Sequence, residues 1–150
     1  EIRLSLVGSE MCIRDRNDHV PTLEQVAERC EHARDFTARR DQAKSARNLA
    51  VRNARTQGAR KKALEEAAGL SQRSVAYLTQ DVKPAPELGV SPDLQQVVDA
   101  ARALEEAEGH LARALDERDL LIRRARKAKH YTLEELQKAT GLARATLYKV

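Results

Sequence analysis

The sequence predicts an all-α protein. Aromatic residues make up only 3% of the 150 residues, whereas 24 residues are alanine and 33% are charged. Sandwiches and barrels are rich in β-branched and aromatic residues, so this composition disfavours sheet and favours helix. Apolar residues also return every three or four positions over long stretches. No stretch reaches the roughly 18–20 apolar residues that cross a bilayer, and no signal peptide is recognisable. We therefore expect a cytoplasmic protein that has no membrane partner.

The first 16 residues are excluded from the fold prediction. The segment from Leu6 to Arg16, LVGSEMCIRDR, resembles the translation of a transposase-type sequencing-library adapter. The alternative is a strand at residues 2–7 that begins the protein. Segments that arise from processing or cloning carry no information about the fold. We expect the native part of the given sequence to begin at Asn17 and, because the chain stops at Val150 within a predicted helix, to be a fragment.

The remaining sequence contains an internal duplication. Residues 81–92, with three prolines, have the composition of an extended linker between a first repeat (residues 17–80) and a second repeat (residues 93–150). Thirteen identities relate the repeats, 71 positions apart (23 and 94) and then 72 apart (64 and 136) after one inserted residue. The identical pairs are Leu23 and Leu94, Gln25 and Gln96, Val26 and Val97, Ala43 and Ala114, Arg47 and Arg118, Leu49 and Leu120, Arg52 and Arg123, Ala54 and Ala125, Arg55 and Arg126, Leu64 and Leu136, Ala67 and Ala139, Gly69 and Gly141, and Leu70 and Leu142.

Each repeat begins with a long predicted helix. Its apolar residues follow alternating steps of three and four, the pattern of a helix of about 35 residues that packs against another helix. We expect the two long helices to pair with each other as a hairpin or coiled coil, or with a second chain in a homodimer. Gly109 either bends the second long helix or divides it in two. The stripe consists of Leu23, Val26, Cys30, Ala33, Val51 and Ala54 in the first repeat, with polar residues at Thr37, Arg40, Lys44 and Arg47, and of Leu94, Val97, Ala101, Leu104, Leu111, Leu115, Ile122 and Ala125 in the second, interrupted by Glu108 and Arg118.

Two short predicted helices with a glycine between them follow each long helix. In the second copy, Thr132 and Glu135 have the spacing of a capping box, which marks a helix start. Gly141 permits the positive-φ turn that ends this helix. In the first copy, Ser71 is placed to cap the second short helix. Small cores are expected from Leu136, Leu142, Leu147 and Val150 in one copy and from Leu64, Leu70, Val75 and Leu78 in the other.

Residues 64–78 and 132–150 resemble the helix-turn-helix of bacterial transcription regulators, resolvases and sigma-factor tail regions. The resemblance implies double-stranded DNA as the partner, because the second helix of this motif enters the major groove and meets base edges. A departure is Ala143, which stands where a capping serine is usual. The base-facing residues that the resemblance implies are Ser71, Gln72, Arg73, Ala76, Tyr77, Ala143, Arg144, Ala145, Tyr148 and Lys149, and the phosphate-facing ones are Arg60, Lys61, Lys62, Ser74, Thr132 and Thr146.

Positive charge gathers beside each of these motifs. Residues 39–64 contain nine basic residues against Asp41 alone, and residues 113–129 contain seven against three acidic ones. Residues 87–108 are acidic, with six carboxylates against Arg102. Such clusters are what phosphate neutralisation requires. The alternative for any single arginine or lysine is an ordinary solvated helix surface.

The sequence contains no pattern that indicates catalysis or metal binding. The four histidines, at positions 19, 32, 110 and 130, lack the spacing of metal ligands. There is no phosphate-binding glycine loop and no nucleophile elbow. We therefore expect no enzymatic activity and no cofactor, and the sequence favours a bacterial transcriptional regulator. Two alternatives remain: a helical protein–protein interaction module, and the DNA-binding part of a recombinase whose catalytic domain is missing.

Overall fold

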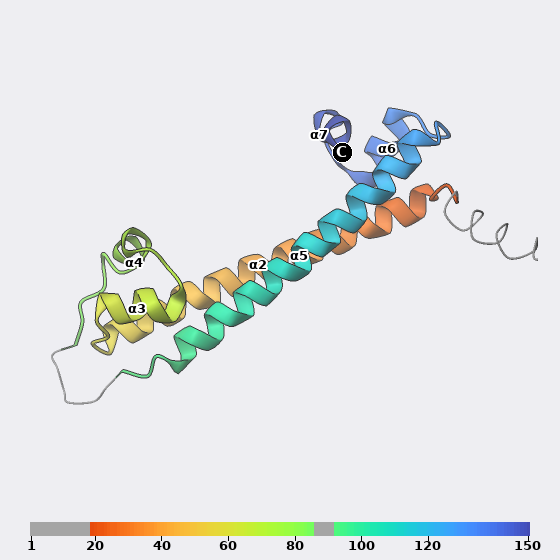
Figure 1. Ribbon diagram of the computed structural model, residues 1–150. Coiled ribbons are helices and arrows are strands. Elements are labelled where there is room, and N and C mark those ends of the chain that lie inside the picture. Colours follow the sequence, from red (N-terminus) through yellow and green to blue (C-terminus); the bar gives the residue numbers. More distant parts are fainter. Residues whose placement is uncertain (1–18, 86–91) are drawn as a thin grey trace, which may run out of the picture. The chain divides into compact units, whose positions relative to one another are not determined.

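The computed structural model describes residues 19–85 and 92–150, and the regular secondary structure of these residues is helix, with no strand (Figure 1). The all-α prediction is confirmed. The predicted adapter segment, and the part of the predicted linker from 86 to 91, lie outside the described residues. The described helices are α2 (Leu23–Thr56), α3 (Lys61–Ala68), α4 (Gln72–Leu78), α5 (Gln95–Lys127), α6 (Leu133–Thr140) and α7 (Arg144–Lys149).

The described chain divides into two compact units. The continuous unit is His32–Leu115, and the split unit joins the residues up to Glu31 with Asp116–Val150. Each unit contains the start of one long helix, the end of the other, and the two short helices that follow that end. The units therefore do not coincide with the two sequence repeats, because each unit draws on both of them.

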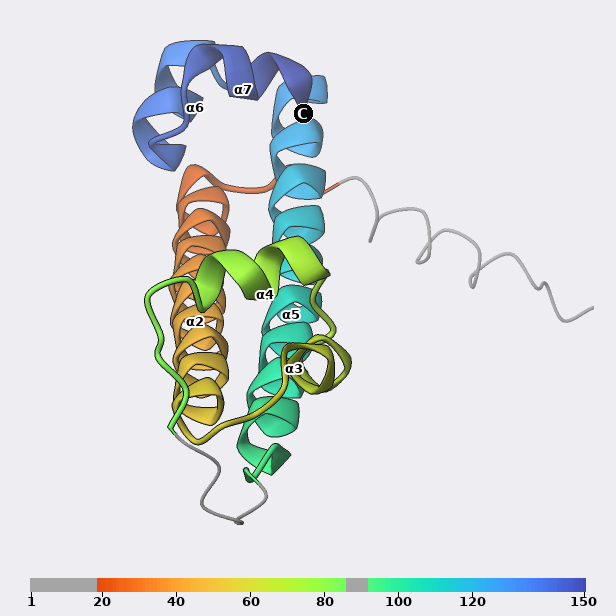
Figure 2. The ribbon, with the colours of Figure 1, turned by 90° about the vertical axis from the view of Figure 1, so that its left-hand side faces the viewer.

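The core of the continuous unit joins both long helices to α3 and α4. Within this unit, the segments of α2 and α5 lie side by side and run in opposite directions (Figures 1 and 2). Leu70 and Leu78 pack against the core as partly buried residues, in agreement with the sequence prediction. The buried members, each at most 5% exposed, are Val51 and Ala54 of α2, Ala59 in the connection between α2 and α3, Leu64 and Ala68 of α3, Val75 of α4, and Val97 of α5.

The core of the split unit likewise joins both long helices to two short ones, here α6 and α7. Cys30 is 3% exposed within it, which confirms that this thiol is a core residue. The predicted core residues Leu142 and Val150 pack against it as partly buried side chains. The buried members are Val26 and Cys30 of α2, Ile122 and Ala125 of α5, Leu136 of α6 and Leu147 of α7.

The long helices have the lengths that their periodicity predicts. α2 contains 34 residues and α5 contains 33. α5 continues through Gly109 without a break, so the alternative of two separate helices is wrong. Leu115 of the predicted α5 stripe is only half-buried, whereas its neighbour Ala114, which the prediction did not include, is buried. Every other apolar residue of the predicted stripes is buried or half-buried.

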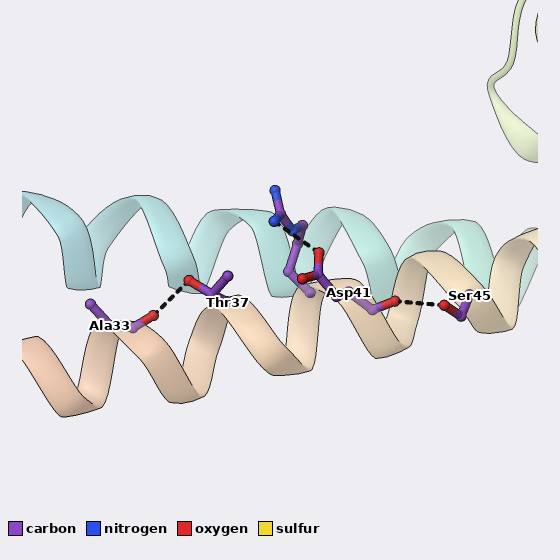
Figure 3. Close-up of polar contacts among 5 residues, drawn as sticks. Ala33, Thr37, Asp41 and Ser45 are labelled. Carbon is purple, nitrogen blue, oxygen red and sulfur yellow. Dashed lines mark hydrogen bonds and ion pairs between the residues drawn. The ribbon is translucent and has the colours of Figure 1, made fainter.

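A polar stretch of α2 begins near Thr37, and two of its hydroxyl groups bond to carbonyls of their own helix. Thr37 Oγ1 donates to the Ala33 carbonyl at 2.9 Å, and Ser45 Oγ donates to the Asp41 carbonyl at 3.0 Å (Figure 3). Arg40 forms an ion pair with Asp41 at 2.8 Å. Hydroxyl bonds to a carbonyl one turn earlier satisfy the side chain but slightly weaken a helix. The residues of α2 that are buried in the core of the continuous unit, Val51 and Ala54, lie beyond this stretch.

Within the described ranges, no helix has both the length and the apolar character that crossing a membrane requires.

Candidate nucleic-acid interface

Both glycine turns adopt the left-handed conformation that the sequence predicts. Gly69 ends α3 with φ 62° and ψ 31°, and Gly141 ends α6 with φ 64° and ψ 14°. The N–H of Gly69 donates to the Glu65 carbonyl, and that of Gly141 donates to the Gln137 carbonyl. Glycine enters this region without the steric cost that a Cβ brings. The two motifs therefore turn from the first short helix into the second with the same backbone geometry.

Side chains fix the starts of the short helices differently in the two copies. Ser71 accepts a hydrogen bond from the Ser74 N–H at 3.3 Å and so caps α4. Ala143 occupies the same place before α7, with a similar extended backbone, and has no side chain that can accept. Since a cap satisfies one of the unpaired amides of the first turn, α7 lacks a bond that α4 has.

The capping box that the sequence predicts at the start of α6 is confirmed. The Glu135 N–H donates to Thr132 Oγ1 at 3.2 Å, and the Thr132 N–H donates to Glu135 Oε2 at 2.8 Å. The Thr132 hydroxyl also donates to Glu135 Oε2, at 3.0 Å. The backbone N–H of Thr132, and then its hydroxyl, lower the pKa of Glu135 because both donate to the ionised carboxylate.

The first set of proposed base-facing residues lies around α4. Ser71, Gln72, Arg73 and Tyr77 are exposed, and Ala76 is half-buried. Tyr77 is 72% exposed, which is unusual for so large an apolar ring. Val75, in the middle of the same helix, is fully buried in the core of the continuous unit. One face of α4 is thus held by the core while the other carries these side chains outward.

The second set lies around α7 in the same pattern. All five residues of the set are exposed, and the ring of Tyr148 is 58% exposed. Leu147 is fully buried in the core of the split unit. The five exposed residues are Ala143, Arg144, Ala145, Tyr148 and Lys149.

The proposed phosphate-facing residues differ in how accessible they are. Arg60, Lys61 and Lys62 are exposed at the start of α3. Ser74 and Thr146 are half-buried, and the Ser74 hydroxyl shares a hydrogen bond of 3.0 Å with that of Ser71. Thr132 is exposed, but the capping box uses both its hydroxyl and its N–H. The three cations are therefore the members of this set with exposed charge.

Two arginines of the basic clusters donate hydrogen bonds to backbone carbonyls of the protein itself. Arg55 Nη1 donates to the Ala59 carbonyl at 2.7 Å, and Arg126 Nη1 donates to the Leu147 carbonyl at 2.6 Å. The guanidinium carbon of Arg126 also lies 5.7 Å from the centre of the Tyr148 ring. Both arginines bind backbone carbonyls near the short helices. Their identity across the repeats is the signal in the sequence that could have suggested an internal contact.

A cluster around Phe36 in the continuous unit is another feature that the sequence does not reveal. The His32 ring meets Phe36 edge-on at 4.7 Å, and the His110 ring stacks on it at 5.6 Å. Arg39 lies 5.2 Å above the same ring. His110 comes from α5, so only the packing of α5 against α2 within this unit brings it to Phe36. These ring contacts involve only residues of α2 and α5, and none of them reaches α4 or its proposed base-facing residues.

The described residues bring together no group of three or more His, Cys, Asp or Glu side chains that could hold a metal ion. No family model matches the chain, and no curated protein or solved structure matches it significantly.

Proposed function

We propose that the chain binds double-stranded DNA in a sequence-dependent manner through α4 and α7, as a bacterial transcriptional regulator. The observation that carries the proposal is the division of each second short helix into a buried and an exposed face. Val75 and Leu147 are fully buried, whereas Tyr77 and Tyr148 are largely exposed. A helix held by one face with polar and aromatic side chains on the other fits the major groove.

The exposed side chains have the donors and methyl groups that read base edges. The guanidinium groups of Arg73 and Arg144 match the two acceptors of guanine. The amide of Gln72 can bond in two places to adenine, and the methyl group of Ala145 suits that of thymine. Arg73, Gln72, Arg144 and Ala145 are all exposed. This chemistry supports discrimination between base pairs rather than attraction to phosphate alone.

Exposed cations near the short helices supply the electrostatic part of binding. In the continuous unit these are Arg60, Lys61 and Lys62 at the start of α3. In the split unit, Arg124 and Lys127 are exposed near the end of α5. Each neutralised phosphate releases counterions, which makes affinity fall as salt rises. Phosphate contacts also fix the orientation of a protein on the duplex.

The decisive measurement is the salt dependence of DNA binding by the full chain. A preferred duplex is first selected from a randomised pool, and fluorescence anisotropy then follows binding to it and to a scrambled duplex. We expect log K to fall linearly with log salt, with a slope of roughly −0.9 for each phosphate contacted. We also expect the selected duplex to bind more tightly. A flat slope, or equal affinity for both duplexes, contradicts the proposal.

Substitution of the proposed base contacts tests the mechanism. Arg73→Ala and Arg144→Ala should each weaken binding to the selected duplex by about 1–3 kcal/mol and binding to scrambled DNA much less. Arg102→Ala is the matched control, because it removes the same charge from an exposed position in the acidic part of α5. Equal losses on both duplexes would assign Arg73 and Arg144 to phosphate instead.

A protein-interaction module is the second candidate, and one observation favours it. Leu49 and Leu120 are 59% and 45% exposed, and they occupy the same position in the two repeats (49 and 120, 71 apart). Exposed large apolar side chains are common in protein interfaces. A flat salt slope together with self-association that Leu49→Lys and Leu120→Lys abolish would favour this function over DNA binding.

A further inference from the structure

Arg126 joins the end of α5 to the last turn of α7. Its Nη1 donates to the Leu147 carbonyl at 2.6 Å across 21 positions of sequence. The same guanidinium lies 5.7 Å from the centre of the Tyr148 ring. A single half-buried side chain therefore contacts two consecutive residues of α7.

We infer that Arg126 is a positioning residue, which fixes α7 against α5 so that Tyr148 and Arg144 are held in place for base contacts. This inference rests on the proposed DNA-binding function. A hydrogen bond to the backbone restrains the helix, and the contact with the ring restrains one of the proposed reading side chains. Both restraints come from α5, whose Ile122 and Ala125 are buried in the core of the split unit.

Arg126 differs in this respect from the neighbouring cation Arg124. Arg124 is exposed, and among the described residues its side chain has no hydrogen bond or ion pair. The two side chains carry the same charge two positions apart on α5. A contact with phosphate predicts similar behaviour for both, whereas the positioning role predicts different behaviour. Arg124 is thus a matched control for Arg126.

The equivalent arginine of the first repeat does not contact the second short helix of its unit in the same way. Arg55 donates to the Ala59 carbonyl, which lies between α2 and α3. The contact with the proposed reading helix is therefore particular to Arg126. The helix that Arg126 contacts, α7, also begins without a side-chain cap, at Ala143.

The first test needs no DNA. In the full chain, amide hydrogen exchange of α7 is compared between wild type, Arg126→Gln and Arg124→Gln. Glutamine ends two bonds earlier than arginine, so it cannot make both contacts. We expect several-fold faster exchange in α7 and a shifted Tyr148 ring resonance for Arg126→Gln only. Unchanged exchange and resonance in that variant would overturn the positioning role.

The second test measures the ratio of affinities for the selected and scrambled duplexes. Arg126→Gln should lower this ratio by about tenfold without changing the salt slope, because it misplaces a base contact. Arg124→Gln should reduce the slope by about one phosphate and leave the ratio unchanged. If Arg126→Gln behaves like Arg124→Gln, the residue is a phosphate contact and the inference is wrong. If the wild type does not bind DNA, the proposed function and the reading role both fail, whereas exchange still decides whether Arg126 holds α7.

A conservative variant keeps the test valid if Arg126→Gln also loses protection in α6, which would indicate unfolding of the split unit. Arg126→Lys retains the charge and a single donor nitrogen but not the planar guanidinium. We expect it to restore protection in α6 while leaving the Tyr148 resonance shifted and the affinity ratio reduced. Loss of protection in α6 in Arg126→Lys as well would mean that Arg126 stabilises the whole split unit rather than positioning α7, and would overturn the inference.

Discussion

At the scale of single residues, Glu135 shows how one side chain determines the start of a helix. Its carboxylate accepts from both the N–H and the hydroxyl of Thr132, and its own N–H donates back to that hydroxyl. These bonds favour the ionised carboxylate and lower the pKa of Glu135 in the folded chain. The start of α6 is therefore tied to the charge on this group.

We predict that this contribution to stability is lost in acid. Because the folded pKa lies below the unfolded one, ionised Glu135 stabilises the fold above the unfolded pKa, and the effect disappears as pH falls through the folded pKa. The difference in thermal midpoint between wild type and Glu135→Gln should thus be largest at neutral pH and shrink in acid. Glu134→Gln, at an exposed neighbour in the same turn, is the control. A difference that does not change with pH would contradict the prediction.

The capping pair was predictable from sequence because its partners are three positions apart. The contacts of Arg55 and Arg126 were not predictable in this way. The bond of Arg126 to Leu147 spans 21 positions and depends on how α7 packs against α5. Counted only as charge, both residues are indistinguishable from phosphate ligands. Local hydrogen bonds follow from spacing, whereas the partner of a long flexible cation depends on tertiary packing.

At the scale of helices, α4 has a side-chain cap at its start and α7 does not. Both begin from an extended residue, Ser71 with φ −69° and Ala143 with φ −63°, but only Ser71 provides a cap. The backbone before α7 is thus already arranged for a side chain that is absent. The sequence predicted this difference correctly, together with both glycine turns and the lengths of the long helices.

We predict that Ala143→Ser stabilises the split unit by about 1 kcal/mol, the usual value of a serine cap. Ser71→Ala should destabilise the continuous unit by a similar amount for the converse reason. Hydrogen exchange of α7 and of α4, respectively, provides the measurement. No gain in protection of α7 would mean that its first turn is held by something other than a cap.

At the scale of the whole molecule, periodicity identified the buried stripes but not their partners. A stripe of apolar residues at steps of three and four is equally compatible with the other repeat and with a second chain. Val97 of α5 packs in one core with Val51, Leu64 and Val75, all from the other repeat. Sequence comparison finds which residues are equivalent, and only packing decides which of them meet.

This arrangement predicts that a substitution in one repeat weakens the short helices of the other. Val97→Ala should destabilise the continuous unit by about 2 kcal/mol, because it removes two buried methyl groups and leaves a cavity. Amide exchange should accelerate in α3 and α4 and remain unchanged in α6 and α7, although Val97 belongs to the repeat that contains α6 and α7. Faster exchange in α6 and α7 instead would mean that the repeats fold independently.

The interleaved composition of the units also imposes an order on synthesis. All residues of the continuous unit have left the ribosome once Leu115 has emerged. Val26 and Cys30 are made first but pack with Leu136 and Leu147, which are made among the last described residues. Closing so long a loop costs little more than closing a shorter one, but apolar side chains that wait uncovered favour aggregation. Among the described residues, the earliest turns of α2 are therefore the apolar surface that waits longest for its packing partners.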